Sequence, residues 1–261
     1  MTLLVPIKAV ATVDEEFELA DDGLDIDPDF LEFELNEWDS YSIEAALALR
    51  EAGDADEVVL VTVGDEEADE ALRAGLAMGA DRAIRVWDEG LPRLLGPLLT
   101  ARLLTAVAAK ESPDLVLCGA QSSDAAYGAT GVALAAALGL PHVAIVRELE
   151  YRAGEGAIEV ARELEGGTVQ RIRVSCPAVV TVQTGLNQPR YATLRAIKQA
   201  EAKPLEVLAA SELGVDPAAV PEAQLRRVYV PELEQAATML DGDAAAVAAR
   251  VAAIVDEAMA A

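Results

Sequence analysis

The chain has 261 residues, 52% of them hydrophobic, and its 46 acidic against 20 basic side chains give a formal net charge of −26. This length suits one large α/β domain with an appendage, or two small domains. The negative charge repels nucleic acid phosphates and anionic membrane surfaces, which argues against both as partners. The acidity fits two explanations: ordinary solubility, or a halophilic source whose salt-rich cytoplasm screens the self-repulsion.

The chain contains no window close to 18 consecutive uncharged apolar residues, so we do not expect it to be inserted in a membrane. Its first ten residues have no basic stretch before their apolar run, which predicts a first buried strand in a cytoplasmic protein, not a signal peptide. Cys118 and Cys176 are isolated in apolar settings, and this fits neither a metal site nor a disulfide framework.

The first predicted strand covers residues 3–10. The acidic stretch that follows, up to residue 35, has apolar residues two or three apart, which predicts short strands or an extended loop. Asp39 or Ser40 can cap the first predicted helix. The apolar face of this helix is formed by Ile43, Leu47 and Ala48.

Predicted strands and helices alternate between residues 58 and 138. The strands cover residues 58–63, 83–87 and 114–118. One helix ends at Gly79, one begins at Pro97, and an alanine-rich segment over 124–138 follows the loop 119–123. Because helices of roughly 12 to 16 residues separate apolar strands, we expect an α/β fold with a doubly wound, mostly parallel sheet covered on both faces.

Residues 142–182 show longer alternating strands, which we expect to be added antiparallel beside the sheet. Beyond Pro204 the chain is polar and interrupted by prolines, up to a predicted helix over roughly 243–259. This helix either folds back on the chain's own core or binds a partner. Its apolar stripe is formed by Val247, Val251, Ile254 and Val255.

The loop Gly119–Thr130 is a candidate phosphate site, because ligands of open parallel sheets bind beyond the carboxyl ends of the strands. It combines glycines with hydroxyl side chains and leads into a predicted helix, whose N-terminal amides favour a phosphate. Taken by itself, however, the segment favours an ordinary strand-to-helix turn capped by Ser123 or Asp124. No glycine-rich dinucleotide fingerprint or P-loop follows a predicted strand, which disfavours a standard dinucleotide or triphosphate site.

The sequence shows no catalytic constellation. His142 is the only histidine and begins an apolar strand, which is typical of a structural imidazole. Acidic pairs such as Glu66 and Glu67 fit a solvated surface. We therefore predict neither catalytic residues nor a metal site.

A longer segment carries a resemblance to a known family. In Val160–Thr181 a strand, a turn at Gly166 and Gly167, and further strands are followed by the polar run Leu186–Tyr191. Arg162, Glu165 and Gln170 are spaced around that turn. The joined segments resemble the signature of the electron-transfer flavoprotein β subunit family, and the resemblance extends from Leu3 to about Leu213, including Ala77–Arg82.

The resemblance implies a fold like that of the adenine nucleotide alpha-hydrolases and Rossmann proteins. It places a nucleotide-binding domain in residues 1–205, with a recognition loop over 185–199. Residues 206–261 would be an arm and helix that pack on the partner subunit.

The resemblance also implies that the β subunit binds AMP or, in bifurcating members, a second FAD. Four segments would hold it, although this chain has Glu37 and Trp38 where the family usually has proline and phenylalanine. Ser122 and Ser123 likewise replace alanine and isoleucine. The implied binding residues are Pro6, Asn36, Glu37, Trp38, Asp39, Val63, Gly119, Ala120, Gln121, Ser122, Ser123, Asp124, Ala125, Ala126, Tyr127, Gly128, Ala129 and Thr130.

The implied function is that of an electron carrier without catalysis of its own. FAD would be held mainly by an α subunit in a heterodimer, with Trp38 either at the flavin or packed in the core. Leu194 would anchor in flavin dehydrogenases, helped by Tyr191, Arg195 and Lys198, or else pack inward together with Ile197. Electrons would pass to a membrane quinone oxidoreductase.

Two alternatives stay open at this point. The first is a bifurcating version that oxidises NADH and holds FAD in the β-subunit site. The second is a stand-alone adenine-nucleotide-binding regulatory protein, because a fold does not fix a function.

Overall fold

The computed structural model describes residues 1–13, 16–92, 94–221, 223, 225–231 and 237–260. The chain forms two compact units, Met1–Arg227 and Val228–Ala261. The first contains all the described strands, and the described part of the second contains the helix α6 (Ala244–Ala260). No helix in the described ranges is long and apolar enough to cross a membrane.

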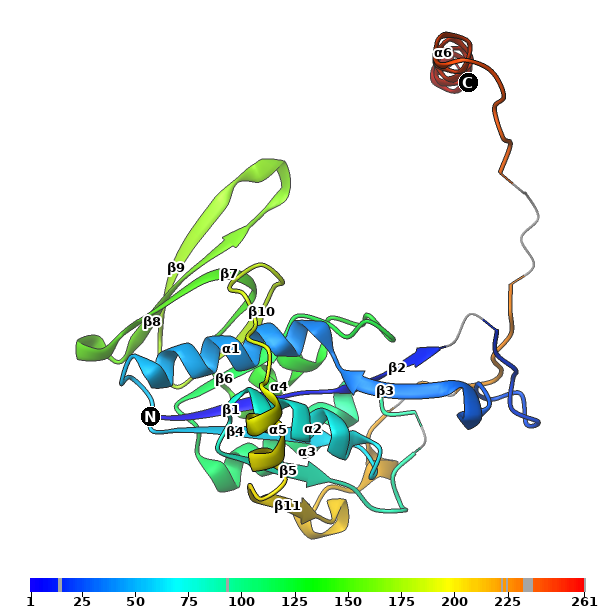
Figure 1. The fold of residues 1–261 in the computed structure, drawn as a ribbon. Coiled ribbons are helices and arrows are strands. Elements are labelled where there is room, and N and C mark those ends of the chain that lie inside the picture. Colours follow the sequence, from blue (N-terminus) through cyan, green and yellow to red (C-terminus); the bar gives the residue numbers. More distant parts are fainter. Residues whose placement is uncertain (14–15, 93, 222, 224, 232–236, 261) are drawn as a thin grey trace. The chain divides into compact units, whose positions relative to one another are not determined.

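The first unit is built on one nine-stranded sheet (Figure 1). Its strand order is β11-β5-β4-β1-β6-β10-β7-β8-β9, and the pairs from β11 to β7 are parallel. The strands are β1 (Thr2–Pro6), β4 (Glu57–Val63), β5 (Arg82–Val86), β6 (Leu115–Gly119), β7 (His142–Arg152), β8 (Ala157–Glu163), β9 (Val169–Ser175), β10 (Ala178–Val182) and β11 (Leu205–Leu208). The doubly wound, mostly parallel sheet is confirmed.

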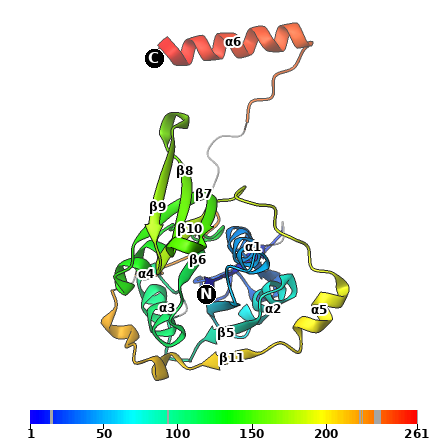
Figure 2. The same ribbon diagram turned by 90° about the vertical axis from the view of Figure 1, so that its left-hand side faces the viewer.

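Helices cover both faces of this sheet (Figure 2). α1 (Glu37–Glu51) and α2 (Ala68–Met78) pack on one face, and α5 (Leu194–Ala200) packs on α2. α3 (Pro97–Glu111) and α4 (Thr130–Leu138) cover the other face. The crossovers thus bury the central strands β1, β4, β6 and β10 from both sides, as their continuous apolar sequences require.

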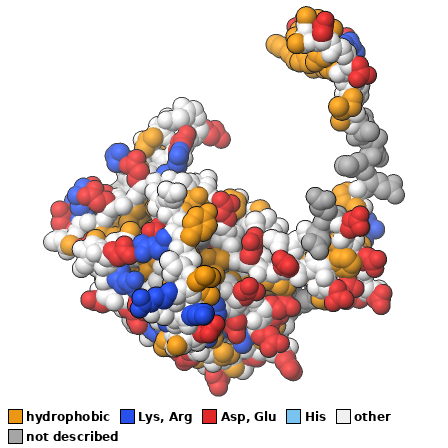
Figure 3. Space-filling view, in the orientation of Figure 1, with side chains coloured by type: hydrophobic (Ala, Val, Ile, Leu, Met, Phe, Trp, Pro, Cys, Tyr) orange, Lys and Arg blue, Asp and Glu red, His pale blue; other side chains and the backbone are white. Residues whose placement is uncertain are grey.

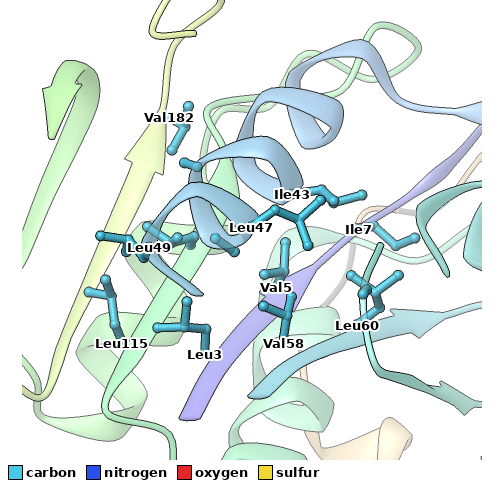
Figure 4. Close-up of a cluster of buried hydrophobic side chains, with 14 of the residues drawn as sticks. Leu3, Val5, Ile7, Ile43, Leu47, Leu49, Val58, Leu60, Leu115 and Val182 are labelled. Atoms are coloured by element: carbon cyan, nitrogen blue, oxygen red, sulfur yellow. The ribbon is translucent and has the colours of Figure 1, made fainter. Parts of the chain in front are cut away.

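Two hydrophobic clusters lie on the two sides of the sheet, because side chains alternate along each strand. Leu3 and Val5 of β1 pack toward α1, whereas Leu4 packs toward α3. The first cluster, drawn in Figure 4, includes Ile43 and Leu47 of α1. This packing fixes where the loops after β1, β4 and β6 begin.

The first helix differs from the expectation in its start and its face. Its N-cap is Asn36, not Asp39 or Ser40, so Asp39 lies in the first turn. Ala48 is exposed, whereas Ile43 and Leu47 are buried as predicted. The apolar run at the N-terminus is divided into β1 and β2 (Ala9–Val13), and β2 pairs antiparallel with β3 (Leu31–Leu35).

The segment 142–182 follows the expectation only in part. β8 and β9 pair antiparallel and form a hairpin, and Arg162 Nε donates to Gln170 Oε1 over 2.9 Å across it. β7 and β10, however, pair parallel with each other, and β10 also runs parallel to β6. The expectation of antiparallel addition is wrong for these two strands, because the connection back to β10 passes through the hairpin and restores the parallel direction.

The segment after residue 204 contributes to the sheet. β11 pairs parallel with β5 at the sheet edge, and two short 3-10 helices follow it. In the second unit, α6 buries none of its residues, and Val251, Ile254 and Val255 are 46%, 42% and 49% exposed. Its apolar stripe is therefore not used within its own unit.

Candidate functional site

Three neighbouring parallel strands end at the same edge of the sheet. Pro6 ends β1, Val63 ends β4 and Gly119 ends β6, and β1 lies between the other two. Helix α1, whose N-cap is Asn36, starts beside this edge, since Asn36 N donates to Lys8 O over 3.0 Å. The fold therefore brings the four predicted nucleotide segments together, where the chain winds in both directions from β1.

Asp39 connects the ends of β1 and β6. Its carboxylate accepts the backbone N–H of Lys8 at 2.8 Å and that of Gly119 at 3.1 Å. The side chain is buried, and this burial raises the pKa of Asp39 to about 7, against the opposing effect of its hydrogen-bond donors. A Cβ at Gly119 would lie 2.2 Å from Asp39 Oδ1, so only glycine allows this approach.

Asn36 attaches the loop 120–129 to the start of α1. Its Nδ2 donates to Gln121 O over 2.9 Å, and its Oδ1 accepts the N–H of Ser123 at 3.2 Å. Asn36 is 1% exposed, and it forms no side-chain cap on its own helix. Its side chain therefore orders the candidate phosphate loop.

The loop itself is exposed and ends later than expected. α4 begins at Thr130, with Ala129 at its N-cap and no side-chain cap, so neither Ser123 nor Asp124 caps it. Although burial opposes it, hydrogen bonds from Lys8 and Ser122 hold the pKa of Asp124 below its ordinary value. Lys8 Nζ lies 2.7 Å from Asp124 Oδ1.

The backbone of this loop suits an anionic ligand. The first amides of an α-helix have no partner inside it, and those of α4 receive no side-chain cap. Gly128 has φ 59°, and a Cβ there would have only Ala120 O, at 3.7 Å, within 4 Å. The residues present therefore fit a phosphate held by backbone N–H groups.

Trp38 is half-buried in the first turn of α1. Its Nε1 donates to Gln183 Oε1 over 3.3 Å, just after β10, whereas Glu37 is exposed. The indole thus connects α1 with the loop that follows β10.

The predicted recognition residues lie on the segment 186–200, outside the nucleotide site. Tyr191 and Leu194 are 97% and 82% exposed, and Ile197, which the inward-packing alternative would bury, is 46% exposed. Thr193 caps α5 by accepting the N–H of Ala196 at 3.2 Å. Figure 3 shows Lys and Arg side chains gathered on the face that carries α5.

The base of this segment is held to α1. Arg190 pairs with Glu44 and Glu51, with its Nε 2.8 Å from Glu44 Oε2, and Asn187 Nδ2 donates to Tyr41 O over 2.9 Å. The side-chain hydrogen bonds of Arg190 hold the pKa of Glu44 below its ordinary value. The exposed tip is thus presented from a fixed base.

Sequence reasoning missed several residues at this edge. Lys8 contributes a backbone N–H and an ion pair, and Gln183 receives the Trp38 bond. Gln183 carried a usable signal, because a polar residue directly follows a buried strand. The sequence carries no such signal for Ile145, whose φ of 62° is unusual within a strand.

Comparison with known proteins agrees with this arrangement. The family described as "Electron transfer flavoprotein domain" matches residues 27–213. The chain is 45% identical over 262 residues to "Electron transfer flavoprotein subunit beta" of Methylophilus methylotrophus, covering 98% of each chain. It is also 38% identical over 216 residues to the Bradyrhizobium diazoefficiens subunit (83% of this chain, 84% of the relative) and 36% over 214 residues to that of Bos taurus (82% and 83%). The chain therefore belongs to the electron transfer flavoprotein family, as a β subunit.

Proposed function

We propose that this chain pairs with an α subunit in a heterodimer and binds an adenine nucleotide at the edge formed by β1, β4 and β6. The observation that carries the proposal is the buried pair Asn36 and Asp39 at that edge: Asn36 holds the loop 120–129, and Asp39 connects the ends of β1 and β6. A buried polar group is costly unless it is hydrogen-bonded, and the hydrogen bonds of both side chains fix the backbone around them. The arrangement here leaves loop backbone and the start of α4 open to a phosphate.

The nucleotide would be AMP in a simple electron carrier, or a second FAD in a bifurcating one. Gly119–Thr130 would hold its phosphate, with Pro6 and Val63 beside the remainder of the ligand. The redox flavin would be held mainly by the α subunit, and Trp38 is our candidate for contact with it. When bound, that flavin takes up and releases the electrons, and the chain contributes binding and orientation.

The direct test is to denature the purified heterodimer and count the released nucleotides. We expect one FAD with one AMP, or two FAD per heterodimer. Release of FAD alone at one per heterodimer would contradict nucleotide binding in this subunit.

We further propose that the exposed tip formed by Tyr191 and Leu194 docks flavin dehydrogenases, before electrons pass to a membrane quinone oxidoreductase. A single apolar anchor gives affinity without a large, slowly dissociating interface. Arg195 and Lys198 beside it would orient an acidic partner.

Replacing Leu194 tests this docking role. Leu194→Ala is expected to slow electron transfer with a dehydrogenase about 10-fold or more in a stopped-flow assay, the factor for losing about 1.4 kcal/mol of anchor contact. Flavin content should be unchanged. Val169→Ala, at another exposed apolar side chain on β9, is the matched control and should react like wild type. Equal rates for all three proteins would rule out the anchor.

A further inference from the structure

The strand β7 carries an extra residue where it pairs with β10. Val143 lies opposite Val180 and Val146 opposite Val182, so three steps along β7 match two along β10. Within this β-bulge Ile145 has φ 62°. A left-handed backbone is strained for a β-branched residue. Bulges beside functional sites often serve to redirect a side chain, and strain of this kind persists only where its surroundings enforce it.

The surroundings of Ile145 do enforce it. Its N–H donates to Thr181 Oγ1 over 2.9 Å, and Thr181 is buried. A Cβ at Gly131 would lie 2.6 Å from Thr181 Cγ2, so the glycine makes room for that methyl group and leaves the hydroxyl facing Ile145. On the other side of the bulge, Gln183 N donates to Val146 O over 2.9 Å.

The result is an apolar side chain directed to the carboxyl edge of the sheet. Ile145 is 51% exposed, although it lies inside a strand. It borders a cavity of about 230 Å³ together with Ala120, Gln121, Gly128, Thr181 and Gln183. Pockets that enclose whole drug-sized ligands measure about 300–1,000 Å³, so this one fits a single ring system of a larger molecule.

Gln183 supplies a polar group to the same cavity. The Trp38 indole N–H is a donor only, so the Gln183 atom that it meets at 3.3 Å is the carbonyl Oε1. This leaves Nε2 of Gln183 as a donor. The cavity thus combines an apolar surface with an amide donor, which are the two contacts that a planar heteroaromatic ring uses.

We propose that Ile145 is a ligand-positioning residue, which packs against the face of a heteroaromatic ring while Gln183 donates to the ring edge. The inference rests on the proposed function, because the ring would be either the adenine of the nucleotide or the flavin ring system. The bulge keeps an unfavourable backbone in order to place this contact.

The test uses the heterodimer freed of its ligands and then titrated separately with AMP and with FAD. Ile145→Asn and Ile145→Gly both accept a left-handed backbone but remove the apolar contact. We expect each variant to melt at a temperature equal to or above that of wild type, and to bind one of the two ligands about 10-fold or more weakly. The ligand that is affected identifies the ring. Val207→Asn, at a 53% exposed residue on the edge strand β11, which five strands separate from β7, should change neither affinity.

Three outcomes of these titrations would contradict the role of Ile145. Unchanged affinities in both variants, with wild type binding normally, would overturn the role of Ile145 and leave the proposed function intact. Weaker binding accompanied by a lower melting temperature would also overturn it, because the residue would then be structural. If wild type itself bound neither ligand, the proposed function would fail first, and this inference with it.

Discussion

The ionisation of Asp39 is coupled to the folding of the chain. In the folded chain burial raises its pKa to about 7, from an ordinary value of 3.8. Between these pH values the folded state binds more protons than the unfolded state. The free energy of unfolding therefore falls as pH rises, by up to about 1.4 kcal/mol per pH unit from this group.

The variant Asp39→Asn isolates this effect. It keeps the size of the side chain, but it cannot titrate and cannot accept both N–H groups with two oxygens. We expect it to be less stable than wild type, with the difference narrowing by about 2–3 kcal/mol between pH 4.5 and 7.5. Urea unfolding at several pH values measures the difference, and Glu206→Gln on β11 is the control. A difference independent of pH would contradict the assignment.

At the scale of elements, the site depends on how closely α1 approaches the end of β6. Gly119 permits this approach, because a Cβ there would also lie 2.9 Å from Trp38 Cβ. The same contact aligns the Asp39 carboxylate with the Gly119 N–H. The position of α1 and the conformation of the loop after Gly119 therefore depend on each other.

Gly119→Ala should push α1 away from the end of β6. We expect a loss of about 2–3 kcal/mol in unfolding free energy, typical of overpacking next to backbone, together with loss of bound nucleotide. Gly154→Ala is the matched control, because a Cβ at Gly154 would meet nothing within 4 Å. Thermal unfolding and nucleotide extraction of both variants provide the measurement. Equal behaviour of the two would show that the approach of α1 is not required.

At the scale of the molecule, the two compact units suggest separate tasks. The first unit contains the sheet, both hydrophobic clusters and the candidate site. The second contains α6, which buries no residue within its unit. An unused apolar stripe on a helix is typical of a segment that packs on another chain, which supports the proposal that α6 contacts the α subunit.

Ending the chain after Arg227 tests this division. The shortened subunit should melt within about 2 °C of the full chain when each is purified alone, because none of the described residues after Arg227 belongs to the buried core. A surface change of a few tenths of a kcal/mol has an effect of this size. Its association with the α subunit should weaken about 100-fold or more, as judged by gel filtration of the yellow complex. Normal assembly would show that α6 is dispensable.

The sequence by itself determined the alternation of strands and helices and the glycine stop of α2, because these follow from local periodicity and backbone preference. The signature around Gly166 and Gly167 also indicated the family. The first residues of helices were harder to predict from the sequence. Asn36 and Asp39 both suit an N-cap, and only their long-range partners, Gln121 and Gly119, decide which of them serves as one.

Tertiary structure alone decided the parallel direction of β7 and β10, the contacts of Gln183 and the backbone of Ile145. Each of these depends on a partner more than 30 residues away in the chain, as Ile145 N depends on Thr181 Oγ1. Local sequence limits which backbone conformations of a residue are low in free energy. The strained backbone conformation of Ile145 is adopted only in the folded sheet. There the hydrogen bonds and packing of neighbouring residues offset the free energy of the strain.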